Sequence, residues 1–335
     1  LILGFSFTCI AVPLVNYFGF KYSIVDKPDS RKQHDKPTVR IGGLAIIIGV
    51  LITNLVCTKF GLINQESILK IDSVLVISAM LFILGFIDDF VSLTFSKRLF
   101  FQFLISLFAF SENIRFLKID LNWLNPNIQI IELPYLLSLI ITLIWIVGII
   151  NAFNWLDGLD GLASGVASIT CLGLGFASFG FNPDDNFLLI FMLCGSCLGF
   201  LYHNFNPAKI FMGDGGSYFI GSFIGLYSIN LYNLNFSDKN FSINLLVLFL
   251  ILFVPIVDMV YVVFSRVLKG KLPFLPDRRH LHHRLLRSGF GHKDSVVFCY
   301  LMSFFFTSIS LFVLYPKYRL MLFFSSIFLN TCFFK

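Results

Sequence analysis

The stretch Pro134-Tyr-Leu-Leu-Ser-Leu-Ile-Ile-Thr-Leu-Ile-Trp-Ile-Val-Gly-Ile-Ile-Asn-Ala152 decides the fold class. It contains no charged side chain, and its length is close to the about 20 residues that a helix needs to cross the hydrocarbon core of a bilayer. Directly after it comes Phe153-Asn-Trp-Leu-Asp-Gly-Leu-Asp-Gly161, which is rich in aspartate and glycine. The sequence therefore joins a membrane span to a polar segment at the end of that span.

The composition of the whole chain indicates that most of its surface faces lipid. Of the 335 residues, 57% are hydrophobic and only 13% are charged, with a mean hydropathy of +0.83. Soluble domains carry about 25% charged residues. We predict an all-α polytopic membrane protein in one domain, residues 1–335, with about eleven transmembrane helices. The expected spans are residues 1–20, 41–60, 70–87, 98–111, 134–152, 162–180, 187–202, 218–235, 244–265, 294–314 and 318–334.

The distribution of Lys and Arg predicts the orientation of these spans. Cytoplasmic loops of membrane proteins are enriched in both residues. With the N-terminus outside and the C-terminus inside, most of the 25 Lys and Arg residues fall in inner loops. This topology explains the net charge of +6, so nucleic acid is not an expected partner.

Five inner loops collect acidic, amide and histidine side chains in a chain that is otherwise poor in them. They are residues 26–43, 85–89, 151–161, 204–217 and 276–284. Alternating spans place all five loops on one side of the membrane, although the orientation was chosen from Lys and Arg alone. We therefore expect one catalytic site, built from these loops at the cytoplasmic face.

Two pairs of carboxylates are the first candidates for chemistry. Asp88 and Asp89 end an apolar run, and adjacent carboxylates repel each other unless a cation or proton intervenes. Asp157 and Asp160 would share one face if a helix begins there. Each pair also has a structural interpretation, as a solvated helix end and as helix N-caps respectively.

Two further loops carry candidates for binding phosphate. Asp214 lies in a glycine-rich turn, whose backbone N–H groups suit anions, and Phe211 suits either the core or stacking on a base. His280, His282 and His283 are three of only six histidines. Zinc is one interpretation of these histidines, but their spacing and the flanking arginines favour phosphate oxygens. A basic loop that serves only topology is the structural alternative.

The residues alone predict metal-dependent phosphoryl chemistry. Carboxylates with asparagines favour a hard cation, Mg²⁺ or Mn²⁺, and a basic loop beside such a cation suits a phosphate or diphosphate substrate. A transporter is the competing class, because Asp258 lies inside a late span and intramembrane charges often mark ion paths. Helix packing is the structural interpretation of Asp258. The clustering of polar residues at one face argues against transport.

Two motifs resemble those of polyprenyl-phosphate N-acetylhexosamine-1-phosphate transferases. They are Asn151-Ala-Phe-Asn-Trp-Leu-Asp-Gly-Leu-Asp-Gly-Leu162 and Pro207-Ala-Lys-Ile-Phe-Met-Gly-Asp-Gly-Gly-Ser217. The likeness extends from Asp26 to Gly289. The segment His280-Leu-His-His-Arg284 is similar to the WecA- and TagO-like subgroup rather than to MraY-type enzymes, which argues against a peptide-bearing muramyl substrate.

The resemblance implies the reaction and its location. It implies transfer of N-acetylhexosamine-1-phosphate, with GlcNAc as the first choice, from a UDP-sugar to undecaprenyl phosphate with release of UMP. Mg²⁺ is the implied cofactor. The lipid-diphosphate-sugar product would initiate a cell-envelope polysaccharide such as O-antigen or teichoic acid at the cytoplasmic face of the bacterial inner membrane. The assembly, including a homodimer, stays open.

The resemblance also implies roles for individual residues. The implied metal ligands are Asp214 and Asn154. The implied catalytic residues are Asp88, Asp89, Asp157, Asp160, His282 and His283. The implied substrate-binding residues are Asn204, Lys209, Phe211, His280, Arg284, Lys97 and Arg98. Arg98 departs from the lysine that TagO-like enzymes carry at this position. In-line attack by the acceptor phosphate is the expected mechanism, and a path through an aspartyl-phosphate on Asp88 or Asp89 is the alternative.

Overall fold

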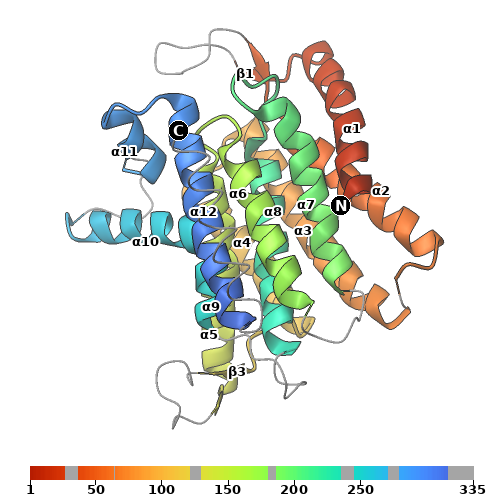
Figure 1. Ribbon diagram of the computed structural model, residues 1–335, viewed down its shortest axis with the longest axis vertical. Helices are drawn as coiled ribbons and strands as arrows, with labels where there is room; N and C mark the ends of the chain where they lie inside the picture. The colour runs from red at the N-terminus through yellow and green to blue at the C-terminus, as the bar shows by residue number, and fades with distance from the viewer. Residues whose placement is uncertain are drawn as a thin grey trace.

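The computed structural model describes residues 1–26, 37–63, 65–120, 130–179, 186–234, 245–270 and 279–315, and these form a bundle of helices (Figure 1). The helices are α1 (Ile2–Lys21), α2 (Gly43–Lys59), α3 (Gln65–Val91), α4 (Phe95–Ser111), α5 (Tyr135–Leu156), α6 (Leu162–Ser178), α7 (Asn186–Asn204), α8 (Gly213–Leu234), α9 (Leu245–Ile251), α10 (Phe253–Val267), α11 (Leu281–Arg287) and α12 (His292–Leu314). Two antiparallel pairs, β1 (Val25–Asp26) with β2 (Thr38–Val39) and β3 (Lys118–Ile119) with β4 (Ile131–Glu132), are the described strands.

The helices confirm a mostly helical, polytopic membrane protein. Five described segments are long and apolar enough to cross a membrane, and the pair α9 and α10 would add a sixth. These five are Ile2–Lys21, Asp72–Val91, Tyr135–Leu156, Phe187–Asn204 and His292–Leu314. Within the described residues, each expected span before residue 315 falls on a single helix, except the span at 244–265. The expected span at 318–334 lies outside the described residues.

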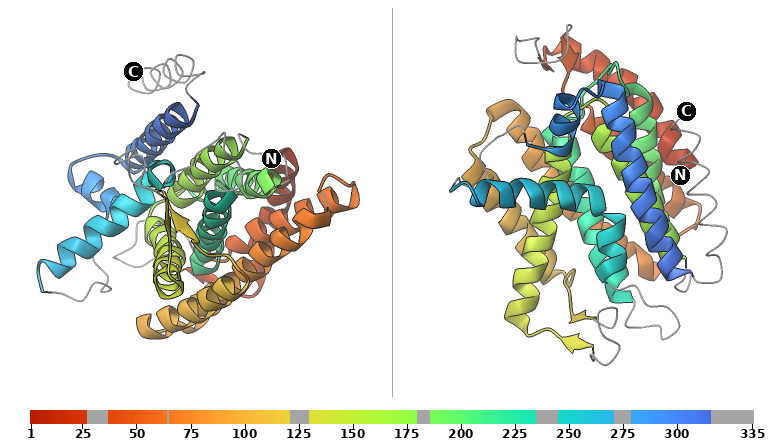
Figure 2. Two further views of the ribbon diagram at one scale, coloured as in Figure 1. Left: turned by 90° about the horizontal axis from the view of Figure 1, so that it is seen from below. Right: turned by 60° about the vertical axis from the view of Figure 1, so that its left-hand side comes forward.

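The structure corrects the expected continuous span over residues 244–265. The chain forms two helices, α9 and α10, which meet at Leu252 with a bend of 88°. Pro255 lies in the first turn of α10, and a proline there cannot donate the hydrogen bond that would continue α9. As a result α10 turns away from the direction of the other helices and projects from the side of the bundle (Figures 1 and 2).

Helix α8 forms the centre of the bundle. Nearly all its residues from Gly213 to Tyr232 are buried. Glycines let two other helices approach its first turn closely: a Cβ atom at Gly43 of α2 would overlap the backbone of Gly216, and one at Gly85 of α3 would overlap the backbone of Asp214. These approaches place Asp214 where three helices meet.

The two ends of the bundle differ. The β1–β2 pair and α11 lie at one end and the β3–β4 pair lies at the other (Figure 1). At the latter end Ile119 pairs with Ile131 and Lys118 with Glu132. The loops with acidic and histidine residues belong to the first end.

Candidate active site

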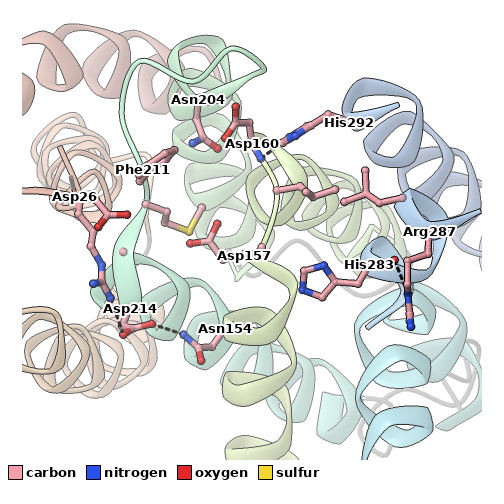
Figure 3. A pocket seen from close by; sticks show the side chains of 16 residues that line it. Asp26, Asn154, Asp157, Asp160, Asn204, Phe211, Asp214, His283, Arg287 and His292 are labelled. Carbon is pink, nitrogen blue, oxygen red and sulfur yellow. Dashed lines mark hydrogen bonds and ion pairs between the residues drawn. The ribbon is translucent and has the colours of Figure 1, made fainter. Parts of the chain in front are cut away.

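A cavity of about 610 Å³ lies at the end of the bundle that carries α11 (Figure 3). Four segments that are far apart in the sequence line it. The polar lining residues are Asp26, Arg40, Asn154, Asp157, Asp160, Asn204, Asp214, His283, Arg287 and His292. The remaining expected loop, residues 85–89, adjoins the cavity through Asp89, which contacts the backbone of Asp214. The five polar loops therefore meet, as the sequence predicts.

Asp214 lies at the centre of this polar cluster. Asn154 donates from Nδ2 to Asp214 Oδ1 over 2.7 Å, and also to Ser217 Oγ over 3.0 Å. The second carboxylate oxygen of Asp214 lies 3.4 Å from Arg40 Nη2. The structure thus brings the two expected metal ligands, Asp214 and Asn154, into direct contact at the cavity.

Asp89 caps helix α8. Its Oδ1 accepts the backbone N–H of Asp214 over 3.0 Å, and its Oδ2 accepts that of Gly215 over 3.2 Å. The first N–H groups of a helix have no partner within the helix, and a carboxylate there also suits the helix dipole. The side chain of Asp89 is 3% exposed. Asp89 therefore holds the turn that carries Asp214. Asp89 itself is not one of the described residues that line the cavity.

Asp88 has partners of its own. It accepts the backbone N–H of Leu93 over 2.7 Å and pairs with Arg98 Nη1 at 3.2 Å. The repulsion expected between Asp88 and Asp89 is thus reduced by two different cations, Arg98 and Arg40. The cavity lining, as far as the chain is described, includes neither Asp88 nor Arg98, and the exposed Lys97 is also absent from it.

Asp157 and Asp160 lie in the turn between α5 and α6, so the shared helix face that the sequence suggested is wrong. Asp160 Oδ2 accepts bonds from Asn206 Nδ2 over 2.9 Å and from the backbone N–H of Ala208 over 3.1 Å. Asp157 differs from it. Burial, with the nearby carboxylates of Asp214 and Asp89, raises the pKa of Asp157 to about 8. Asp157 is therefore largely protonated at neutral pH in the folded protein.

The segment from Asn204 to Asp214 is hydrogen-bonded to two of the other polar loops. Asn204 accepts the N–H of Gly161 over 3.0 Å and donates to the carbonyl of Ile210 over 2.8 Å. The backbone of Phe211 bonds to Val39 and Gly42, and its side chain lines the cavity. Lys209 is exposed and is not one of the described lining residues, so the structure does not bring it to the site.

Helix α11 contributes one histidine to the cavity and buries another. His283 lines the cavity, and its carbonyl accepts a bond of 3.2 Å from Arg287 Nε. His282 is 2% exposed and packs where a Cβ at Gly158 would overlap its ring. Burial and the neighbouring His283 lower the pKa of His282 to about 3, so this side chain is neutral. Its Nδ1 has no hydrogen-bond partner among the described residues.

Two of the expected substrate-binding residues lie behind the cavity. His280 Nδ1 is 2.8 Å from Asp258 Oδ2, and the Arg284 guanidinium lies 4.6 Å from the ring centre of Tyr261. These contacts join α11 to α10. The packing interpretation of Asp258 is therefore confirmed.

Three cavity residues were missed by sequence reasoning: Asp26, Arg40 and His292. Arg287 is one of the arginines beside the histidines that the sequence assigned to phosphate oxygens. His292 Nε2 accepts the backbone N–H of Asp160 over 3.0 Å. The sequence did offer a signal for His292, because histidine is rare in this chain, with six in all, and His292 lies just before an expected span. Arg40 and Asp26 had no signal beyond their place in the first polar loop.

Comparisons with known proteins identify relatives of this chain. Residues 71–232 match the model of glycosyl transferase family 4. A probable undecaprenyl-phosphate N-acetylglucosaminyl 1-phosphate transferase of Bacillus subtilis is 34% identical over 91% of this chain and 81% of its own length. A decaprenyl-phosphate N-acetylglucosaminephosphotransferase of Mycobacterium leprae is 33% identical over 88% and 78%. An undecaprenyl-phosphate alpha-N-acetylglucosaminyl 1-phosphate transferase of Salmonella typhi is 28% identical over 89% and 78%.

The fold and the site thus define a membrane transferase with an acidic cavity between its helices. The chain belongs to the polyprenyl-phosphate N-acetylhexosamine-1-phosphate transferases of glycosyl transferase family 4. The resemblance carried by its two motifs is confirmed.

Proposed function

We propose that the protein transfers N-acetylglucosamine-1-phosphate from UDP-GlcNAc to undecaprenyl phosphate, releases UMP, and so starts a cell-envelope polysaccharide. The observation that carries this proposal is the cavity itself. It joins Asp214, Asn154 and Asp157 to the cations Arg40 and Arg287 in a chain whose relatives are named for this transfer. Its volume of about 610 Å³ lies within the range of pockets that enclose small ligands.

The donor fits the cavity in one direction. Phe211 offers an aromatic face for the uracil ring. His283 and Arg287 offer donors for the diphosphate from the opposite wall (Figure 3). Asp157 lies between these two walls, on the path of the donor from its base to its diphosphate (Figure 3).

A Mg²⁺ or Mn²⁺ cofactor fits the donor atoms of the site. Among the described residues no three acidic, histidine or cysteine side chains form a complete ligand set. Mg²⁺ is usually held by one or two carboxylates together with substrate phosphates and water. Asp214 would supply a carboxylate ligand, and Asn154, whose Nδ2 donates to Asp214 in this structure, would supply its amide oxygen once its side-chain amide turns over. A bound cation would also favour the ionised form of Asp157 nearby. The bound cation would neutralise charge on the donor diphosphate.

The transfer requires little proton chemistry from the protein. An oxygen of the acceptor phosphate forms a bond to the sugar-linked phosphorus, and the bond from that phosphorus to the UMP oxygen breaks. A phosphate monoester with a second pKa of about 6 is already largely ionised at neutral pH. Arg40 and Arg287 would orient the diphosphate for in-line attack. Asp88 and Asp89 are both engaged by other groups, which favours this one-step path over an aspartyl-phosphate.

We place the cavity at the cytoplasmic face of the bacterial inner membrane. The argument is the excess of Lys and Arg on the inner loops of a chain with its N-terminus outside, its C-terminus inside and about eleven spans. A transporter is not favoured, because Asp258 is bonded to His280 and to the Leu281 N–H at the histidine loop.

A donor panel tests the proposal. Purified protein with undecaprenyl phosphate and Mg²⁺ is given labelled UDP-GlcNAc, UDP-GalNAc or UDP-glucose, and lipid product and UMP are both measured. Equal amounts of lipid-linked GlcNAc and UMP are expected, with Asp214→Asn as the inactive control. No labelled lipid from any UDP-N-acetylhexosamine would refute the proposal.

A further inference from the structure

Helix α10 holds the histidine segment along one face. Asp258, Tyr261 and Ser265 are spaced three and four residues apart, so their side chains share one side of the helix. Arg279 Nη1 donates to the carbonyl and the hydroxyl of Ser265 over 3.0 and 2.9 Å. Arg284 lies over the ring of Tyr261. The segment from Arg279 to Arg284 is thus fixed on α10 at both of its ends.

Asp258 makes the central contact of this face. Its Oδ2 lies 2.8 Å from His280 Nδ1, and its Oδ1 accepts the N–H of Leu281 over 2.6 Å. A carboxylate only accepts hydrogen bonds, so the proton of His280 must lie on Nδ1. The side chains of Asp258 and His280 are 3% and 9% exposed, and water is therefore a poor substitute partner for either. Both carboxylate oxygens are needed, because each meets a different donor.

The contact continues from His280 into the cavity. The ring of His280 stacks on that of His282, with planes 8° apart, and lies against Trp155 at the end of α5. His282 in turn packs against Gly158 in the turn that carries Asp157. His283, next in sequence, lines the cavity. The position of His283 at the cavity therefore depends on Asp258, whose carboxylate does not itself line the cavity.

We propose that Asp258 is a positioning residue for the transferase reaction: it fixes α11 so that His283 and Arg287 face the diphosphate of the nucleotide-sugar donor. This inference rests on the proposed function. It predicts a selective defect, in which recognition of the donor suffers while recognition of the lipid acceptor does not.

The test compares Asp258→Asn, Asp258→Glu and wild type. An asparagine offers one acceptor oxygen to two donors, so it cannot replace the carboxylate. For Asp258→Asn we expect kcat/KM for the donor to fall about 10- to 100-fold, the scale for losing a partner that supports a site from outside it, with a raised donor KM. The acceptor KM should stay within about twofold. Asp258→Glu keeps both oxygens and should recover part of the loss, whereas mere misfolding would lower kcat and leave both KM values unchanged.

A second measurement is independent of activity. Hydrogen–deuterium exchange of the Asp258→Asn protein should be faster in peptides that cover α11, starting at the Leu281 amide, and unchanged in α8. Glu112→Gln, the same chemical change at an exposed site after α4, is the matched control and should match wild type in both assays. If Asp258→Asn does not fold, Tyr261→Leu removes the platform of Arg284 and should show the same selective defect in smaller measure.

Wild-type donor KM together with wild-type exchange in α11 would overturn the inference, as would equal losses for donor and acceptor. If the wild-type protein showed no transfer from any UDP-N-acetylhexosamine, the proposed function would fail instead. Faster exchange in α11 of Asp258→Asn would then still show that Asp258 fixes this helix, so the two failures are distinguishable.

Discussion

Arg40 bridges Asp89 and Asp214: its Nε lies 3.1 Å from Asp89 Oδ1 and its Nη2 lies 3.4 Å from Asp214 Oδ2. The two carboxylates have different tasks, since Asp89 caps α8 and Asp214 faces the cavity. A guanidinium group can contact both at once because its donors form a planar fork. Arg40 thus connects the structural support of the site to the residue that we expect to bind the metal.

The bridge predicts that charge alone is not sufficient at position 40. Arg40→Lys keeps the charge but presents a single ammonium group, and we expect kcat to fall about tenfold. Arg40→Gln removes the charge and should cost about 100-fold, the scale for losing one donor aimed at developing charge. Steady-state rates of UMP release with purified protein measure both. Full activity of Arg40→Gln would rule out a role for Arg40 in holding the donor.

The raised pKa of Asp157 predicts an unusual dependence of stability on pH. In the unfolded chain this carboxyl ionises near pH 4, but in the folded protein it stays protonated up to its pKa of about 8. The folded state is therefore progressively destabilised as the pH rises from about 4 to 8. Asp157→Asn removes this cost. In metal-free buffer we expect its melting temperature to exceed that of wild type by about 5 °C at pH 8, with little difference at pH 4.5.

Mg²⁺ provides the check on this explanation. A cation near Asp214 would favour ionised Asp157, so adding Mg²⁺ should reduce the difference between the two proteins at pH 8. Activity should fall in the variant although stability rises. A difference in melting temperature that is the same at both pH values would contradict the assignment to the ionisation of Asp157.

Gly158 should not tolerate a side chain. A Cβ at this position would overlap the ring of His282, which is buried and cannot move away easily. We expect Gly158→Ala to lower kcat/KM for the donor at least about tenfold, because the turn that carries Asp157 must shift away from α11. Gly148→Ala in α5 is the matched control. Its nearest side-chain contact would be an ordinary 3.5 Å to Met259, so activity should be retained.

The engagement of Asp88 and Asp89 predicts that no phosphorylated enzyme forms. Incubation with UDP-GlcNAc labelled in the sugar-linked phosphate, without acceptor, should leave the protein unlabelled after rapid quenching. Labelled lipid should appear only when undecaprenyl phosphate is added. A labelled aspartate at either position would establish the two-step path and refute in-line transfer.

The sequence predicted the membrane class and the meeting of the polar loops, because apolar runs and rare charges are visible without a structure. It did not predict which of two adjacent aspartates supports Asp214, since that depends on the direction in which α3 presents each side chain. The bend after Ile251 was visible in principle through Pro255. The pairing of Asp258 with His280 was not, because sequence spacing does not show how the start of α11 packs against α10.

The close approach of Gly43 and Gly85 to the start of α8 has a consequence for how accurately Asp214 is held. A contact between two side chains allows alternative rotamers, whereas a contact between two backbones has none. The main chain that carries Asp214 is therefore located by three helices without any intervening torsional freedom. Exchanges of apolar side chains elsewhere in the bundle can change its stability and its fit to lipid, while the main chain that carries Asp214 keeps its place as long as those glycines remain.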